Sequence, residues 1–411
     1  MENSFLSEFK KREYFNQCTN SNELELFMNE QKIRAYIGFD CTAPSLHVGS
    51  LIQIMCLRLL QKHGHQPIVL LGGGTTRIGD PSGKEETRKI LSEKEIEKNI
   101  KNIEKIFKIF LKTKKPKTKP IFVNNYKWLS KLNYIKFLRE IGKHFTINKM
   151  LSFDSVKLRL EREQSLSYME FNYMILQAYD FLELNKTKNC IMQIGGSDQW
   201  GNIVNGVELI KRHSNKQVFG LTTPLLTLTS GSKMGKTEKG AIWLDKKLLS
   251  PYDYWQFWRN TDDRDVIKFL QMFTDLRLEK IEQIKNNNIN QLKILLANET
   301  TSMLHGKVAA QKAEQTAKDT FEKRSIGESL PLVNIKKKEL TNGINILDLV
   351  IAANLLSSKS ETRRMIKNKG IKINNETVED DKLTVTLNNF NQDNSMKLSH
   401  GKKNHVILKI V

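Results

Sequence analysis

The sequence has no long hydrophobic stretch and very little cysteine. No run of about 18 apolar residues occurs, which predicts that no segment spans a membrane. The stretch Met1 to Arg12 is polar and lacks the apolar core of a secretory signal, so a cytoplasmic protein is expected. The four cysteines contain no C-x-x-C pair, so we predict free thiols, with neither a disulfide framework nor a metal site.

Acidic residues are also scarce relative to basic ones. Asp and Glu total 45 against 66 Lys and Arg, which gives a net charge of +21. Such an excess favours a polyanionic partner, most often nucleic acid, although a general drift towards Lys and Asn is the alternative. The length of 411 residues predicts two or three domains, and 39% hydrophobic with 27% charged residues is typical of a soluble globular chain.

The rest of the chain is organised around the stretch Tyr36–Ser50. Apolar residues alternate from Ile33 to Phe39, which predicts a buried strand, and an apolar-periodic helix follows from Leu51 to Gln61. A strand, a turn of small residues and a helix N-terminus together form a potential anion site. His47 lies at the start of that helix, and Gly49 permits close approach of a nucleotide to the backbone.

A second strand, Gln66–Leu71, ends in the glycine-rich segment 72–84. The Walker phosphate loop would need glycine at position 78 and Ser or Thr at position 85, where this chain has Ile78 and Glu85. Any nucleotide must therefore be held by a structure other than a Walker phosphate loop. Asp80 follows the carboxyl end of the strand, where open α/β sheets bind ligands, but a plain turn residue before Pro81 is an equal alternative.

Between residues 85 and 150 the pattern indicates an inserted helical segment. Ser92 and Glu95 form a capping-box pattern, and apolar residues recur at helical spacing up to Leu111. A short strand is expected at residues 121–123. The insertion either supplies a dimer surface or simply packs on the core, and the pattern does not distinguish the two.

A helix around Tyr168–Leu184 carries polar groups on an apolar background. Tyr173, Gln177 and Asp180 lie at i, i+4 and i+7 and share one face. Buried polar groups need partners, which are either internal side chains or a small ligand with an ammonium and a hydroxyl group.

The strand-turn-helix design then recurs. A buried strand at 190–194 leads into Gly195–Asn202, where Asp198 is suited to ribose hydroxyls. Together with the opening stretch, this predicts an α/β fold with a doubly wound parallel sheet that binds a nucleotide at its switch point. After a strand at 218–222, Lys233 and Lys236 lie between glycines in a cationic loop, for which a solvated turn is the alternative.

The opening stretch resembles the HIGH signature of class I aminoacyl-tRNA synthetases, and Lys233–Thr237 resembles their KMSKS loop. The intervening segments Gly79–Pro81 and Gln193–Asn202 are similar to those of bacterial-type tyrosyl-tRNA synthetases. The resemblance implies a tyrosine–tRNA ligase with a Rossmann-like catalytic domain. ATP with Mg²⁺, L-tyrosine and tRNA-Tyr would be its substrates, a homodimer its assembly and the cytoplasm its location. A tryptophan-specific relative and a noncatalytic RNA-binding protein remain rivals.

The resemblance also implies roles for individual residues. Tyr36 and Asp180 would bind the phenol of tyrosine from two sides. Its ammonium and carboxylate would meet Asp80, Tyr173, Gln177 and Gln199. The adenosine part of ATP would contact Gly38, Asp40, Gly49, Ser50, Gly196 and Asp198. The phosphates of ATP would contact Thr42, His47, Lys84, Arg88, Lys233, Lys236 and Thr237.

Two positions depart from the family pattern. Ser50 replaces the second signature histidine, and Ile37 replaces a cysteine that meets the ribose in relatives. We expect Ser50 either to bond through water or to cap the N–H groups of the following helix.

The remaining chain predicts two further domains. Catalytic residues 1–247 are followed by an α-helical domain at 248–325, a linker at 326–342 and a small α+β domain at 343–411. Ser360–Asn374 resembles the RNA-binding domain named after ribosomal small-subunit protein four. Arg363, Arg364 and Lys367 lie at helical spacing, where they either meet tRNA phosphates or form a solvated basic face.

Overall fold

The computed structural model describes residues 4–80, 91–229, 234–237, 240–321, 330–341, 343–391, 393–401 and 404–411. Lys84, Arg88 and Lys233 lie outside the described residues. The chain forms two compact units, one of Met1–Leu249 with Asn260–Leu304 and the other of Ser250–Arg259 with His305–Val411. No helix of the described ranges combines the length and apolar character needed to cross a membrane.

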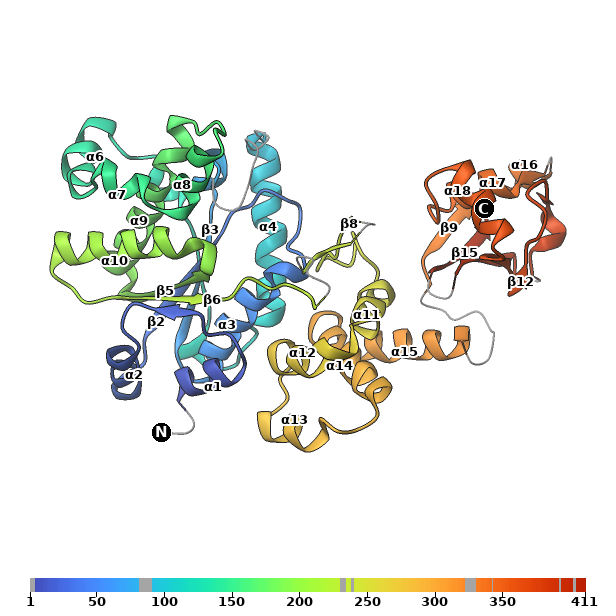
Figure 1. Ribbon diagram of the computed structural model, residues 1–411, viewed down its shortest axis with the longest axis horizontal. Coiled ribbons are helices and arrows are strands. Elements are labelled where there is room, and N and C mark those ends of the chain that lie inside the picture. Colours follow the sequence, from blue (N-terminus) through green and yellow to red (C-terminus); the bar gives the residue numbers. More distant parts are fainter. Residues whose placement is uncertain are drawn as a thin grey trace. The chain divides into compact units, whose positions relative to one another are not determined.

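A parallel sheet organises the first unit (Figure 1). Its strand order is β1-β6-β5-β2-β3-β4, and all neighbours are parallel except the short β1 beside β6. The chain winds outward from β2 through β3 to β4, and then from β5 to β6 on the other side of β2. The switch point lies between β2 and β5, as the doubly wound prediction requires. The strands are β1 (Gln17–Cys18), β2 (Arg34–Phe39), β3 (Gln66–Leu71), β4 (Ile121–Asn124), β5 (Cys190–Gly196) and β6 (Phe219–Thr223).

Both faces of the sheet are covered, which explains why its strands are nearly continuous apolar runs. Side chains of β2 alternate between the faces. The Tyr36 ring lies 5.4 Å from Phe181 of α9 on one face, and the Phe39 ring lies 4.7 Å from Phe107 of α4 on the other. Helix α10 packs along α9, and α3 packs beside α4.

The helices of this unit begin at the expected signals. Ser92 and Ser167 each form a complete capping box, the first as predicted at the start of α4. The helices before β6 are α1 (Phe5–Lys11), α2 (Ser21–Glu30), α3 (Leu51–Lys62), α4 (Glu93–Phe110), α5 (Tyr126–Leu129), α6 (Tyr134–Glu140), α7 (Ile147–Leu151), α8 (Asp154–Glu161), α9 (Tyr168–Lys188) and α10 (Trp200–Ser214). A small hairpin of β7 (Lys236–Thr237) and β8 (Gly240–Ala241) follows β6.

The helical pattern expected after residue 248 is confirmed by helices α11 to α15. Ser250 accepts a hydrogen bond from the Asp253 N–H at 3.1 Å, with Pro251 as the first helical residue of α11. Helices α12 (Val266–Phe273), α13 (Leu278–Ile284) and most of α14 (Ile289–His305) belong to the first unit. Helices α11 (Pro251–Arg259) and α15 (Lys307–Phe321) pack together in the second.

The C-terminal part is a small α+β fold built on a five-stranded sheet of order β12-β11-β14-β15-β9. The linker prediction is wrong for residues 332–341, because they form β9 and α16, and β9 pairs in parallel with β15. The lysines at 336–338 favoured a linker, so the apolar edge strand before them was not predicted. The elements are β9 (Leu332–Ile335), α16 (Lys337–Thr341), β10 (Ile344–Asn345), α17 (Ile346–Ala352), α18 (Lys359–Lys367), β11 (Ile371–Ile373), β12 (Glu376–Thr377), β13 (Thr384–Val385), β14 (Ser395–His400) and β15 (Asn404–Ile410).

Candidate active site

A cavity of about 370 Å³ opens at the carboxyl ends of β2 and β5. It therefore lies at the topological switch point, where open α/β sheets bind their ligands. Among the residues predicted from the sequence, its lining includes Tyr36, Gly38, Asp40, Thr42, Gly49, Ser50, Asp80, Tyr173, Gln177, Asp180, Gly196, Asp198 and Gln199. One cavity thus brings together predicted residues from four separate stretches of the chain.

The deep end of the cavity holds Tyr36 and Asp180, both almost completely buried. The Asp180 carboxylate accepts hydrogen bonds from Asn125 Nδ2 at 2.9 Å and Trp128 Nε1 at 2.7 Å. Burial nevertheless raises the pKa of Asp180 to about 7. The Tyr36 hydroxyl has no hydrogen-bond partner among the described residues, and burial raises its pKa well above the usual value.

An orphaned hydroxyl and a carboxylate in a buried pocket are costly unless a ligand completes them. A ligand hydroxyl can donate to the carboxylate and accept from the tyrosine at the same time. Gln193, which pairs with Tyr36 across the sheet, adds a second buried atom in this region, because its Oε1 lacks a partner in the described chain. The arrangement suits a phenol at the deep end.

Asp40 connects three elements at one wall of the cavity. It accepts from Thr75 Oγ1 at 2.7 Å and from the Tyr173 hydroxyl at 3.1 Å. The Asn125 Nδ2 that contacts Asp180 also donates to Thr75 at 3.0 Å. Gly72 is required beside this group, since a Cβ there would collide with Asp40 and Thr75. The glycine-rich segment therefore makes room for a polar network.

A second network crosses the opposite wall. Gln199 Nε2 donates to Asp80 at 3.0 Å, and Asn202 Nδ2 donates to both Gln199 and Gln177 at 3.1 Å. The polar face of α9 thus has internal partners, as one of the two alternatives expected, and it also faces the cavity. The alternative of a small ligand stays a prediction. Asp80 is a cavity carboxylate rather than a plain turn residue.

His47 lies at the start of the helix as predicted, but it does not line the cavity. Its Nδ1 accepts from the Gly49 N–H at 3.0 Å, and its ring stacks edge-on against Trp243. Accepting at Nδ1 leaves the proton of the neutral ring on Nε2, where the ring can donate. Of the two alternatives for Ser50, capping of α3 is wrong, because its side chain makes no cap hydrogen bond. A bond through water stays a prediction.

The described end of the predicted cationic loop and the segment after it pack directly on the HIGH-like stretch. Val48 N–H donates to Ile242 O at 2.9 Å. Gly235 has φ +106°, and a Cβ there would lie 2.8 Å from the Gly49 nitrogen, so only glycine fits comfortably. The backbone of Lys236 and Thr237 forms β7 immediately beyond. Although far apart in sequence, the two signature regions are in contact.

Five residues at or beside the cavity were not predicted from the sequence. Gln53, Thr75 and Gln193 line it, and Asn125 and Trp128 donate hydrogen bonds to Asp180. Asn125 had a usable signal, because Asn124 and Asn125 directly follow the predicted strand at 121–123, at the ligand-binding edge of a parallel sheet. Trp128 had none, because its role depends on a contact with Asp180 that no local pattern reveals.

Comparison with known proteins agrees with this geometry. Residues 28–322 match the family of class I tRNA synthetases for tryptophan and tyrosine (W and Y), and residues 322–408 match the SYY-like C-terminal domain of tyrosine–tRNA ligases. A tyrosine–tRNA ligase of Pelagibacter ubique is 69% identical over 409 residues, covering 100% of both chains. The chain belongs to the class I tyrosyl-tRNA synthetases.

Further relatives of this synthetase family are consistent with the assignment. A tyrosine–tRNA ligase of Rickettsia felis is 51% identical over 99% of this chain and 100% of its own. A C-terminally truncated mitochondrial tyrosyl-tRNA synthetase of Aspergillus nidulans has 30% identity and a TM-score of 0.71, covering 78% of this chain and 94% of that one. The tyrosyl-tRNA synthetase of Archaeoglobus fulgidus, solved with L-tyrosine, shares the fold at 19% identity and a TM-score of 0.55. The prediction from the paired signatures is confirmed.

Proposed function

We propose that the cavity activates L-tyrosine with ATP and that the full chain then transfers tyrosine to the terminal ribose of tRNA-Tyr. One observation carries this proposal: the Tyr36 hydroxyl, which has no partner among the described residues, and the Asp180 carboxylate both lie at the deep end of the cavity. The phenol of tyrosine would donate to Asp180 and accept from Tyr36, which satisfies both groups.

Further out, the polar walls suit the amino-acid backbone. Asp80, Tyr173 and Gln177 would surround the ammonium group, since a carboxylate and two neutral oxygens all accept hydrogen bonds from it. Gln199, which already donates to Asp80, would lie beside the carboxylate of tyrosine. Tyrosine would thereby be held at both ends, which orients its carboxylate for reaction.

ATP would occupy the mouth of the cavity. Gly38, Gly49 and Gly196 let the nucleotide approach the backbone, and Asp198 and Asp40 are acceptors for ribose hydroxyls and adenosine. Ser50 lines this region with one short hydroxyl. Mg²⁺ would accompany ATP as part of the substrate, because its preferred partners are phosphate oxygens and water.

The activation step needs no side-chain base. The ionised carboxylate of tyrosine attacks the α-phosphorus of ATP, the bond to the bridging oxygen breaks, and pyrophosphate leaves with the electron pair. Negative charge grows on the phosphates, so donors and cations that bind best in the transition state supply the rate. Thr42 and His47 would contact the phosphates on one side. On the other side, the phosphates would contact Lys84, Arg88, Lys233, Lys236 and Thr237.

The C-terminal domain would bind the tRNA. Arg363, Arg364 and Lys367 are exposed on α18, as their spacing predicts, and Arg363 pairs with Asp381 at 3.2 Å. Phosphate contacts of this kind position RNA without reading its sequence. A chain ending near residue 330 should therefore still form tyrosyl-adenylate but charge tRNA poorly, and binding by the full chain should weaken steeply with added salt.

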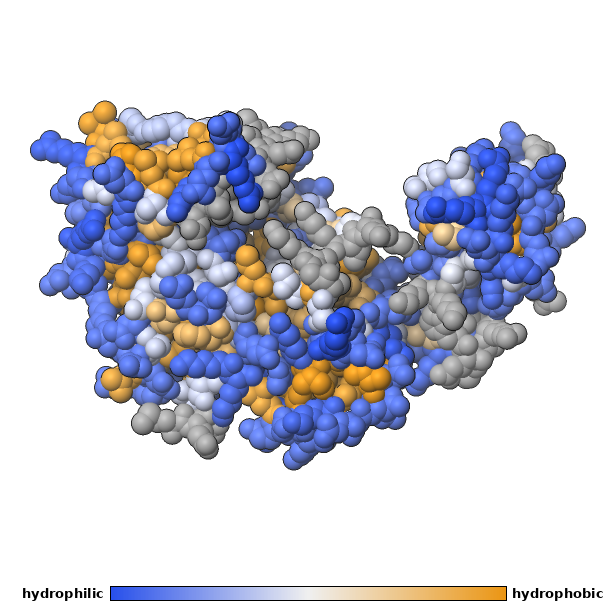
Figure 2. Space-filling model, in the orientation of Figure 1, coloured by the Kyte–Doolittle hydropathy of each residue, from blue (hydrophilic) through white to orange (hydrophobic). Residues whose placement is uncertain are grey.

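The segment between β4 and α9, which includes the later part of the insertion predicted at residues 85–150, would supply a homodimer surface. Its short helices expose Tyr134, Ile135, Leu138, Ile147, Leu151 and Leu160. Figure 2 shows apolar residues gathered over this part of the first unit. Exposed apolar patches of this kind mark protein interfaces. We therefore propose that the protein is a cytoplasmic homodimer.

Tyrosine-dependent exchange of pyrophosphate into ATP tests the function directly. The proposal expects exchange with tyrosine and essentially none with tryptophan or phenylalanine, together with charging of tRNA-Tyr. Exchange driven by tryptophan would favour the tryptophan-specific rival, and RNA binding without any exchange would favour a noncatalytic RNA-binding protein.

A further inference from the structure

Asp265 makes a two-point contact with the chain just ahead of the signature lysines. Its carboxylate accepts from Thr229 Oγ1 at 2.5 Å and from the Thr229 N–H at 3.0 Å. Asp265 is only 5% exposed. A buried carboxylate is expensive unless hydrogen bonds satisfy it, so this contact fixes Thr229 in position as well as orientation.

Thr229 occupies the beginning of a segment that matters for phosphate chemistry. It lies four residues before Lys233 and seven before Lys236. Beyond it, Met234 N–H donates to Leu226 O at 3.1 Å, and Gly235 packs against His47 and Gly49. Lys236 therefore lies two residues after a contact with Leu226, and Leu226 lies three residues before Thr229, which Asp265 holds.

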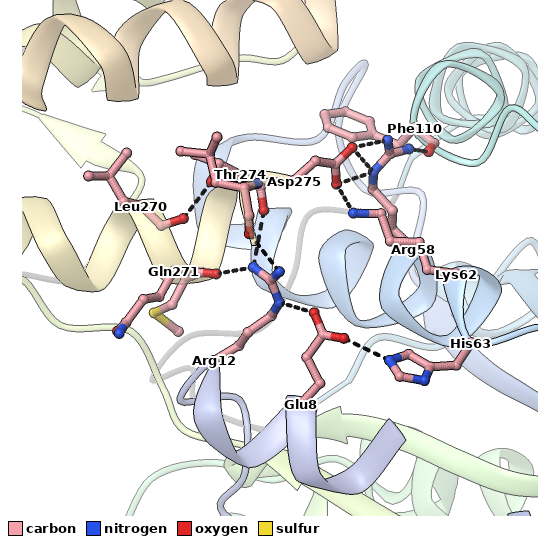
Figure 3. Close-up of polar contacts among 12 residues, drawn as sticks. Glu8, Arg12, Arg58, Lys62, His63, Phe110, Leu270, Gln271, Thr274 and Asp275 are labelled. Carbon is pink, nitrogen blue, oxygen red and sulfur yellow. Dashed lines mark hydrogen bonds and ion pairs between the residues drawn. The ribbon is translucent and has the colours of Figure 1, made fainter. Parts of the chain in front are cut away.

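Asp265 is attached to a firmly held helix. It ends the short turn Asp263–Asp265 and directly precedes α12. At the other end of α12, Arg12 donates to the carbonyls of Gln271 at 2.7 Å and Thr274 at 3.2 Å (Figure 3). The Tyr14 hydroxyl donates to Met272 O. These bonds satisfy carbonyl groups that a helix C-terminus leaves without partners.

The same end of α12 is bound to the helix that follows His47. Asp275 forms ion pairs with Arg58 and Lys62 of α3 (Figure 3), and Arg58 Nε lies 2.9 Å from Asp275 Oδ1. These charges lower the pKa of Asp275 to about 2, although burial opposes the shift. Helix α12 thus connects α3, which begins beside His47 and Gly49, to Thr229.

We propose that Asp265 is a positioning residue for tyrosyl-adenylate formation: through Thr229 and the contact between Leu226 and Met234, it holds Lys236 in register with the N-terminus of α3. The proposal rests on the proposed function of the cavity. Asp265 contacts no substrate in this account. It acts through Thr229, and its effect falls on the step in which charge develops on the phosphates rather than on tyrosine binding.

The test compares single-turnover adenylate formation with tyrosine binding in the full-length protein. Asp265→Asn keeps the size of the side chain but cannot accept both Thr229 hydrogen bonds. We expect the rate of adenylate formation to fall about tenfold or more, since small misplacements of reacting groups are costly, while the tyrosine Kd stays within about twofold. Asp263→Asn is the matched control, because Asp263 shares the turn but is 65% exposed and pairs with Lys293.

Substitutions of Thr229 provide an independent arm. Thr229→Ser retains the hydroxyl and should keep the wild-type rate, whereas Thr229→Val should slow the reaction. Combined with Asp265→Asn, Thr229→Val should add little further loss, because both changes break one contact. If Asp265→Asn fails to fold, the comparison of Thr229→Ser with Thr229→Val decides.

Three results would overturn the proposal: an unchanged rate in folded Asp265→Asn, equal losses in rate and tyrosine affinity, or equal rates for Thr229→Ser and Thr229→Val. A wild-type chain without tyrosine-dependent exchange would instead refute the proposed function itself.

Discussion

The indole Nε1–H of Trp128 donates to Asp180 at 2.7 Å and connects the insertion after β4 to the deep end of the cavity. Asp180 has a second donor, Asn125, which bonds to the other carboxylate oxygen. The two donors orient the carboxylate that faces Tyr36. The segment expected to supply a dimer surface or pack on the core therefore also shapes this cavity.

Trp128→Phe tests this relationship. The substitution keeps the aromatic body but removes the donor, so the buried carboxylate loses one of its two observed hydrogen bonds. We expect tyrosine binding to weaken by about 1.5–3 kcal/mol, the usual size for hydrogen bonds to charged groups. ATP binding in the same variant is the internal control. Equal weakening for tyrosine and ATP would mean that the substitution distorts the whole site.

The raised pKa of Asp180 predicts a pH dependence of tyrosine binding. Burial gives the carboxyl group of Asp180 a pKa of about 7, and it accepts from a phenol best when ionised. Affinity for tyrosine should therefore rise between about pH 6 and pH 8 as Asp180 loses its proton. Calorimetric titration at several pH values measures this, and Asp180→Asn should remove most of the dependence.

The same group affects folding stability with a definite sign. The pKa is raised from 3.8 to about 7 on folding, so the folded protein binds a proton that the unfolded chain has lost across this range. The contribution of Asp180 to the free energy of unfolding is fully present below 3.8 and declines as the pH rises through about 7. Asp180→Asn should flatten that slope in ligand-free denaturant unfolding. An unchanged slope would contradict the buried-carboxylate account.

His47 and Ser50 should contribute unequally to activation. Ser50 makes no cap hydrogen bond, whereas His47 organises Gly49 and contacts Trp243. We expect Ser50→Ala to change the free energy of activation by less than about 1 kcal/mol and His47→Ala by several times more. Single-turnover rates of adenylate formation rank the two variants, and the reverse order would refute the assignment.

The sequence predicted the fold well where the signals are local. Apolar runs located the strands of the main sheet, and the capping box at Ser92 marked a helix start within the expected turn. The polar face of α9 pointed to the site because hydroxyl, amide and carboxylate groups recur at helical spacing on an apolar background. These features depend on neighbours in the chain, which a sequence displays directly.

What the sequence did not reveal depends on contacts between distant segments. Trp128 belongs to the site only because it contacts Asp180, and Thr229 is important only because it contacts Asp265. Ser50 occupies the N-cap position but makes no cap bond, since its backbone is already helical there. Contacts between distant segments decide the first two cases, and the local backbone conformation decides the third.

The most direct test of the central claim is the ratio of tyrosine to phenylalanine activation in wild type, Tyr36→Phe and Asp180→Ala. A buried polar site penalises a substrate that leaves its groups unpaired, and tyrosyl-tRNA synthetases are themselves the standard example of this penalty. The account predicts that both variants lose tyrosine affinity and much of their discrimination against phenylalanine. Wild-type selectivity retained in both variants would contradict the claim that Tyr36 and Asp180 read the phenol.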